Sequence, residues 1–204
     1  MATDESPHRR PHAAPASERG PLPRRTAWRS VARCVVTTVG MLRRGEITWP
    51  RTYVGRRIRF GDGTTGRVYR ETAVGRTPAH PCVLVVTFRL RAVRGRGHAW
   101  FRRESLLNTP LFVGFPGFVS KLWLAHDERG RYRGIYQWDG ARSAEHYVRS
   151  LWRVLELVSE PDSIDYRVLP GRRRDEVLTD PGPVGGPAPA DPAVWWRPVA
   201  GGGA

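Results

Sequence analysis

The sequence is poor in several residue types on which common functional sites depend. Lys121 is the only lysine among 204 residues, although lysine and arginine together number 34. The two cysteines, Cys34 and Cys82, lie far apart and outside any C-x-x-C or other metal-binding spacing. No nucleophile elbow, dinucleotide fingerprint or phosphate-binding glycine loop is present. We therefore expect reduced cysteines and no metal or other cofactor.

Long uninterrupted apolar segments are also missing. The first 26 residues include basic residues but no apolar stretch after them, so they do not read as a secretory signal. Residues 105–124 have the length of a membrane span, but two prolines, two glycines and Lys121 interrupt them. Residues 1–26 and 179–204 are rich in proline, alanine and other small residues, and we expect disordered tails there. These features predict a cytoplasmic protein with one ordered domain over residues 27–178.

Acidic residues are too few to balance the basic ones, and the formal net charge is +15. A basic face for nucleic acid or lipid would explain this charge, and so would arginine that is frequent throughout the chain. The positive charge is spread over residues 1–50, 51–82 and 83–178 and is not concentrated in one tract. This distribution favours the second explanation, so we expect neither nucleic acid nor a membrane as a partner.

Residues 27–45 are predicted to form an N-terminal helix that ends near Gly45. One helical stripe of apolar residues consists of Trp28, Val31, Ala32, Val35, Val39 and Leu42. Arginines lie off the stripe, so the helix could pack on the domain or act as a basic amphipathic membrane anchor. We favour packing on the domain.

The rest of the domain alternates strands and helices. Residues 56–74 read as a β-hairpin with its turn at residues 61–63. Residues 82–170 follow the order β-α-β-β-α-β, in which the first helix covers about residues 97–109. The predicted fold is therefore α+β, with a ferredoxin-like antiparallel sheet and two helices on one of its faces.

Lys121 is expected on an aromatic face of the two strands within residues 118–139. A turn at residues 127–130 would place Lys121 opposite Tyr136 and Trp123 opposite Gly134. The aromatic face would then carry Val119, Lys121, Trp123, Tyr132, Tyr136 and Trp138. The opposite face would carry Phe118, Ser120, Leu122, Leu124 and Ile135, and we expect the helices to pack there.

A lysine among aromatic rings can be held by cation–π contacts, and burial would lower its pKa. It would then serve as a general base or as an anchor for an anion. The alternative is a lysine on an exposed sheet face, or one paired with an acid across a dimer interface. Both alternatives remain open from the sequence.

Further candidate site residues surround this face in the predicted arrangement. His98 and His146 are candidates for acid–base catalysis together with Lys121. The candidate substrate-binding residues are Trp123, Tyr136, Trp138, Glu104 and Asn108. Histidines, acids and amides at such positions also serve as helix caps or solvated surface groups, so these assignments compete with a structural role.

Four segments carry a resemblance to a known family: VLVVTFRL, GFPGFVSKLWL, GRYRGIYQWDG and AEHYVRSLWRVL. Over about residues 83–170 the chain resembles the YdhR-like monooxygenases of the dimeric α/β-barrel superfamily. The resemblance rests on the Lys-x-Trp strand, the following Gly-x-Tyr, and the turn into the second helix. It implies a homodimer in which two ferredoxin-like units join through their sheets, each with a pocket between sheet and helices. Some members of such families oxidise aromatic substrates with no metal or flavin.

The expected function is binding of a small hydrophobic or aromatic molecule, with cofactor-independent monooxygenation of an aromatic or polyketide-like compound as the expected activity. The alternative is a non-catalytic ligand-binding or interaction module. An RNA-binding sheet is less favoured, because the aromatic–Gly–aromatic spacing of that module is missing from GFVSKLWL. The helix and hairpin within residues 27–74 lie outside the resemblance.

Overall fold

A computed structural model describes residues 20–91, 109–160, 162–179 and 191–199. The α-helices are α1 (Arg24–Arg43), α3 (Ala141–Val158) and α4 (Arg174–Thr179), and two 3-10 turns are η2 (Thr109–Leu111) and η3 (Pro192–Val194). The strands are β1 (Ile47–Thr48), β2 (Arg57–Phe60), β3 (Thr65–Val74), β4 (Pro81–Arg89), β5 (Phe118–Leu124), β6 (Arg131–Asp139), β7 (Asp165–Pro170) and β8 (Pro198–Val199). The predicted α+β class is confirmed, and the helix predicted near residues 97–109 falls almost entirely outside the described residues.

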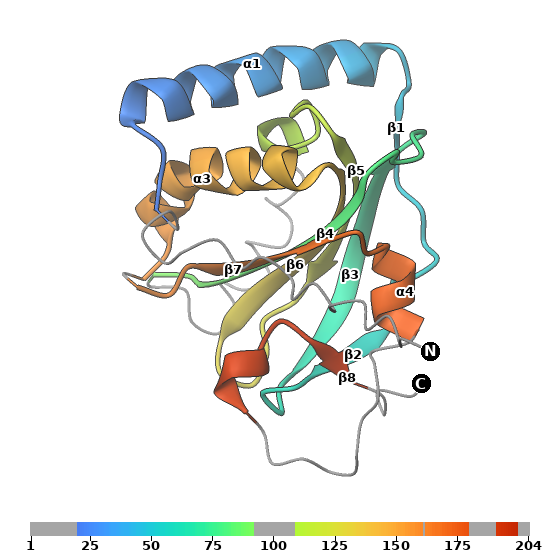
Figure 1. Ribbon diagram of the computed structural model, residues 1–204, viewed down its shortest axis with the longest axis vertical. Coiled ribbons are helices and arrows are strands. Elements are labelled where there is room, and N and C mark those ends of the chain that lie inside the picture. Colours follow the sequence, from blue (N-terminus) through green and yellow to red (C-terminus); the bar gives the residue numbers. More distant parts are fainter. Residues whose placement is uncertain (1–19, 92–108, 161, 180–190, 200–204) are drawn as a thin grey trace, which may run out of the picture.

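The strands form one curled antiparallel sheet, a half-barrel (Figure 1). Its order is β7-β4-β6-β5-β3-β2-β8, with β1 paired to β3. The predicted hairpin is confirmed: Arg59 of β2 lies opposite Thr65 of β3, and Gly63 in the turn has φ 81°, a value that glycine adopts without strain. Strand β3 also pairs with β5, so the hairpin extends the sheet beyond β5.

The predicted register of β5 and β6 is confirmed. Lys121 lies opposite Tyr136, and Trp123 lies opposite Gly134. A register shift between Phe118 and Ser120 turns Phe118 toward the same side as Lys121, which the simple alternation of side chains did not predict.

Two hydrophobic clusters lie on opposite faces of the sheet. Successive residues of β4 belong to one cluster and then the other, and successive side chains of a strand point to opposite faces. The helix-side cluster includes Trp123, Tyr136 and Trp138 together with Tyr147 of α3. For α3, the expectation that the helices pack on the aliphatic face is therefore wrong. Large rings fill the space between the sheet and the helices, whereas Leu122, Leu124 and Ile135 belong to the second cluster.

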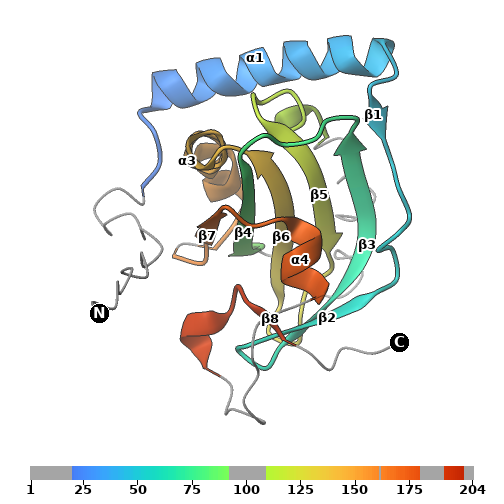
Figure 2. The same ribbon diagram turned by 45° about the vertical axis from the view of Figure 1, so that its right-hand side comes forward.

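Helix α1 packs on the domain through a different stripe from the predicted one. Figures 1 and 2 show α1 as the outermost layer, above α3. The buried residues of α1 are Ala27, Val31, Cys34, Thr38 and Met41. Small residues are favoured here because the backbones approach closely: a Cβ atom at Gly114 would overlap the carbonyl oxygen of Cys34. Trp28, Val39 and Leu42, which we predicted to pack inward, are exposed.

The C-terminal segment covers the second face of the sheet, and Figure 2 shows α4 and β8 on that side. Within the predicted tail, residues 191–199 instead form η3 and β8, and β8 pairs with β2. The side chain of Trp195 is 8% exposed and packs in the second cluster with Val177 of α4. Burial of a large ring gives this short segment the apolar surface that its Pro- and Gly-rich surroundings lack. Within the described ranges, no helix is both long and apolar enough to cross a membrane.

Candidate functional site

Lys121 extends from the centre of the sheet into the helix-side cluster. Its Nζ atom lies 3.2 Å from the ring centroid of Trp123, 4.4 Å from that of Phe112 and 4.8 Å from that of Tyr136. The residue is only 7% exposed. Strands β5 and β6 position Trp123 and Tyr136 because these residues share one face of the sheet with Lys121, and Phe112 follows η2.

Burial lowers the pKa of Lys121 well below its usual value, and the nearby positive charge of Arg70 lowers it further. The three rings oppose this shift, because cation–π contacts favour the charged form by about 2 kcal/mol when desolvated. Removing an ammonium from water costs several kcal/mol, so burial outweighs the rings. No carboxylate among the described residues forms an ion pair with Lys121. These surroundings therefore favour the uncharged form of the Lys121 amine.

Arg70 of β3 is the second cation of this site. Its guanidinium carbon lies 5.2 Å from the centroid of the Trp123 ring, and its Nη2 donates a hydrogen bond to Thr109 Oγ1 at 2.7 Å. Burial lowers the pKa of Arg70. The indole N–H of Trp123 donates to Thr72 Oγ1 at 3.2 Å, which fixes the ring plane beneath the amine. Two cationic side chains thus flank one indole.

Tyr136 and Tyr147 add two phenol groups to the same region. The Tyr147 hydroxyl donates to the Tyr136 hydroxyl at 3.1 Å. Burial raises the pKa of both residues, so both phenols stay protonated at neutral pH. The Tyr136 ring lies over Gly134, where a Cβ atom would be 2.7 Å from the Tyr136 Cε2 atom. Glycine at this position therefore lets the ring pack flat on the strand.

The structure brings some of the predicted site residues together and separates others. Trp123 and Tyr136 contact Lys121, while Trp138 packs against Phe118 and Tyr147 in the adjoining part of the cluster. His146 lies on the exposed side of α3, where its Nε2 is 3.1 Å from Ser30 Oγ. His98, Glu104 and Asn108 lie outside the described residues.

Sequence reasoning missed Arg70, Phe112 and Tyr147. Arg70 belongs to the hairpin, and only the pairing of β3 with β5 brings it to the site. Phe112 lies in the Pro- and Gly-rich corner before β5, which gives no periodic signal. Tyr147 lies on the buried face of α3, and no sequence signal pointed to the hydrogen bond between its hydroxyl and that of Tyr136.

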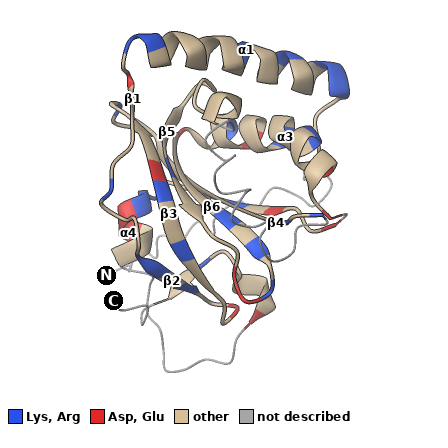
Figure 3. Ribbon diagram, turned by 180° about the vertical axis from the view of Figure 1, so that it is seen from behind, with Lys and Arg blue, Asp and Glu red and all other residues tan. Residues whose placement is uncertain are grey.

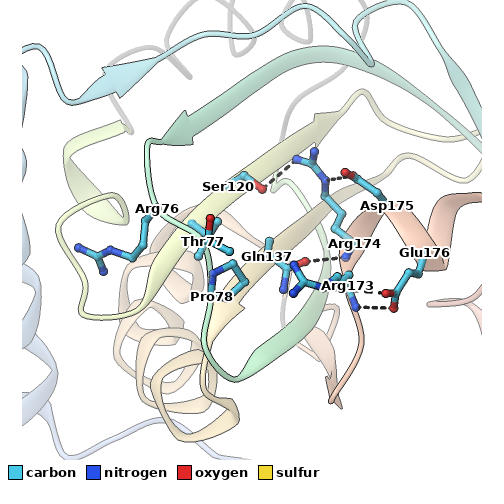
Figure 4. Close-up of a pocket in the computed structure, with 10 residues that line it drawn as sticks. Arg76, Thr77, Pro78, Ser120, Gln137, Arg173, Arg174, Asp175 and Glu176 are labelled. Atoms are coloured by element: carbon cyan, nitrogen blue, oxygen red, sulfur yellow. Dashed lines mark hydrogen bonds and ion pairs between the residues drawn. The ribbon is translucent and has the colours of Figure 1, made fainter.

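A polar pocket lies on the opposite side of the sheet, between α4 and the β3–β4 connection (Figure 4). It encloses about 260 Å³, and its walls include Arg76, Ser120, Gln137 and Arg174. Arg174 is already bonded there: Nη1 donates to Ser120 Oγ at 2.9 Å, and Nη2 pairs with Glu71 Oε1 at 3.0 Å. These bonds satisfy the guanidinium of Arg174 within the fold.

Among the described residues, no group of three or more His, Cys, Asp or Glu could hold a metal ion. Burial raises the pKa of Cys34 to about 11 and of Cys82 to about 12, so both thiols are protonated and unreactive at neutral pH. No family model, curated protein or solved structure matches this chain.

Proposed function

We propose that this chain binds a small aromatic molecule beside Lys121 and acts on it through the uncharged amine. The observation that carries the proposal is the surroundings of Nζ: three aromatic rings and the guanidinium of Arg70, with no carboxylate from the described residues. The burial of a lysine with such neighbours opposes folding. Strongly shifted pKa values of this kind are more frequent at functional sites than elsewhere.

The chemistry that fits is proton abstraction. An uncharged Lys121 amine can take the proton of a phenol or of a methylene activated by neighbouring carbonyl groups. The ammonium formed in this step and the Arg70 guanidinium then stabilise the new anion. The reaction thus produces an ammonium and an anion that stabilise each other as an ion pair.

Cofactor-independent monooxygenation extends this step. The resonance-stabilised anion would reduce O2 directly: a CH2 group becomes C=O, one oxygen atom enters the product, and the other leaves as water with the two hydrogens. The substrate supplies all four electrons, so no flavin or metal is required. This activity agrees with the resemblance to YdhR-like monooxygenases over residues 83–170.

The strand order supports the same relationship. β7-β4-β6-β5 is the order that a β-α-β-β-α-β unit gives when its last strand joins the sheet beside its first. A ferredoxin-like core extended by the hairpin and β8 is therefore part of the proposal. A homodimer joined sheet to sheet would require the C-terminal segment to leave the face that Trp195 now covers.

A non-catalytic binding module is the second candidate. The position of His146 favours it, because the recorded contacts of this histidine are with Ser30 and Phe115 and not with Lys121. A base without an acid partner can bind and ionise a ligand without turning it over.

Reductive alkylation tests whether the side-chain amine of Lys121 is uncharged and reactive. The full chain would be incubated at pH 7 with benzaldehyde and sodium cyanoborohydride, and benzylated peptides identified by mass spectrometry. Lys121 is the only lysine, so the N-terminal amine serves as an internal reference. We expect benzylation of Lys121 and none at that position in Lys121→Arg. Benzylation of the N-terminal amine alone would contradict the proposal.

Turnover separates the two candidates. Oxygen uptake would be followed with aromatic substrates that have an acidic methylene, using a chelator-treated protein. The monooxygenase is supported if the unmodified chain consumes one O2 for each carbonyl group formed and the Lys121→Met variant consumes none. Saturable binding without oxygen uptake supports the binding module.

A further inference from the structure

The outward side of α1 carries an apolar stripe that the described structure does not cover. Trp28 is 48% exposed, Val39 39% and Leu42 41%, and the neighbouring Val36 is 75% exposed. Trp28, Val39 and Leu42 are rotated by roughly 100° around the helix from the buried stripe, and Val36 by roughly 180°, at 100° per residue. A run of this kind along a helix marks an interaction surface rather than scattered exposed residues.

The charge on α1 has one sign. Its sequence, RRTAWRSVARCVVTTVGMLR, contains five arginines and no acidic residue. Figure 3 shows basic residues at both ends and in the middle of α1 and no acidic residue on it. Helical geometry places Arg25, Arg29 and Arg43 beyond the apolar stripe, on the side away from the domain core. None of the ion pairs formed by described residues uses an arginine of α1.

We propose that the outward face of α1 docks on an anionic lipid surface. The combination of an apolar stripe that includes tryptophan with flanking arginines is that of a helix lying in the plane of a membrane interface. Each arginine near an anionic leaflet strengthens binding about fivefold. A second copy of this chain is a poorer occupant, because two α1 helices would bring arginines against arginines with no acidic residue to pair with them.

The place of α1 in the fold permits this docking. It forms the outermost layer, with α3 and the sheet on its other side (Figures 1 and 2). A helix of 20 residues is about 30 Å long, so its full length can lie flat on a bilayer. Trp49, just beyond β1, is 52% exposed and adds a second indole near the C-terminal end of α1. The inference is independent of the chemistry proposed for Lys121.

Vesicle flotation of the full chain tests the proposal. Vesicles of phosphatidylcholine alone would be compared with vesicles that contain phosphatidylserine, at low and high salt. We expect binding to the anionic vesicles only, and a strong decrease in bound protein at high salt. The triple variant Trp28→Ser, Val39→Ser, Leu42→Ser should lose at least tenfold in binding. The matched control Leu157→Ser, Val158→Ser, which removes exposed apolar residues of α3, should bind as the unmodified chain does.

A second pair of variants tests the charge. Arg25→Gln, Arg29→Gln, Arg43→Gln should weaken binding about a hundredfold, whereas Arg57→Gln, Arg59→Gln, Arg67→Gln on the exposed side of the hairpin should change it little. Equal losses in both variants would show binding by general charge and overturn the assignment to α1. The proposal would also be overturned if the unmodified chain bound no vesicles but formed a dimer that the triple serine variant abolished. The stripe would then bind a second copy of this chain.

Discussion

Arg133 and Lys121 are two of the buried basic residues in this half-barrel, and their surroundings differ completely. Arg133 of β6 pairs with Asp62 at 2.8 Å and with Asp127 at 2.7 Å, and both carboxylates are fully buried. Lys121 of β5 is equally buried but faces three aromatic rings and a second cation. The arginine is paired with charge of opposite sign, while the lysine forms no ion pair with any carboxylate in the described part of the chain.

This difference identifies Arg133 as a structural residue and Lys121 as a candidate functional residue. Asp62 lies in the turn of the β2–β3 hairpin and Asp127 in the turn between β5 and β6, so Arg133 ties the two turns together. Each carboxylate also accepts backbone N–H groups of its own turn, as Asp62 does from Thr64. Lys121 joins no such pair, and its burial opposes folding. Its chemistry, not its contribution to stability, is the reason to propose a site there.

Arg133→Met should have the largest effect of the changes considered. It leaves two buried carboxylates without their main partner, and we expect a loss of about 3–5 kcal/mol in the free energy of unfolding. Chemical denaturation measures this loss. Arg131→Met is the matched control, since Arg131 is partly exposed and bonds the same aspartates less closely, and about 1 kcal/mol is expected.

Neutralising the two aspartates in the Arg133→Met variant tests whether the loss of stability comes from their unpaired charges. Asp62→Asn and Asp127→Asn keep the side-chain oxygens that accept the backbone N–H groups but remove the charges. Added to Arg133→Met, they should recover part of the lost stability. No recovery would mean that packing of the arginine, for example its stacking on Phe60, matters more than its charge.

Lys121→Met should act in the opposite direction and stabilise the fold, by about 1–4 kcal/mol at neutral pH. The unfolded chain holds a proton on Lys121 that the folded chain releases, because the folded pKa is lowered. Stability of the unmodified chain therefore rises with pH between the lowered folded pKa and about 10.4, its unfolded value. The advantage of the methionine variant should shrink over this window, and denaturation curves at several pH values measure it. A stability difference between the two chains that does not change with pH would contradict a lowered pKa of Lys121.

How far the sequence could predict these regions depends on the kind of signal. Register and turn chemistry predicted Lys121 opposite Tyr136, because a short hairpin fixes the pairing of its strands. Apolar periodicity over residues 141–158 likewise matches the buried face of α3, which includes Ala144, Tyr147 and Leu151. In α1 the larger apolar residues suggested the wrong stripe. The helix instead buries a stripe that includes the small residues Ala27, Cys34 and Thr38, because its backbone closely approaches that of Gly114.

Contacts between distant segments could not be predicted. The carboxylates around Arg133 come from two turns whose closeness depends on β3 pairing with β5. Sequence analysis explained Asp62 as a turn residue, which it is, but gave no sign of its ion pairs. The docking of Trp195 could not be predicted for the same reason, because the other members of its cluster come from distant segments that include β2, β3 and α4.

Arg70→Gln should have the smallest effect. It removes the second cation of the site, so the pKa of Lys121 should rise but stay below its usual value, because burial is the larger cause of the shift. The control Arg67→Gln changes an exposed residue of the same strand and should leave the pKa of Lys121 unchanged. A pKa that returns to its ordinary value in Arg70→Gln would mean that charge repulsion, and not burial, sets it.

The pKa of Lys121 itself tests the central claim most directly. With one lysine in the chain, labelling with ¹³C-lysine gives a single Cε resonance that can be followed through a pH titration. The account predicts a midpoint well below the usual value of about 10.4. A midpoint at or above that value would show a permanently charged ammonium held by the rings, and would contradict the amine chemistry proposed for this site.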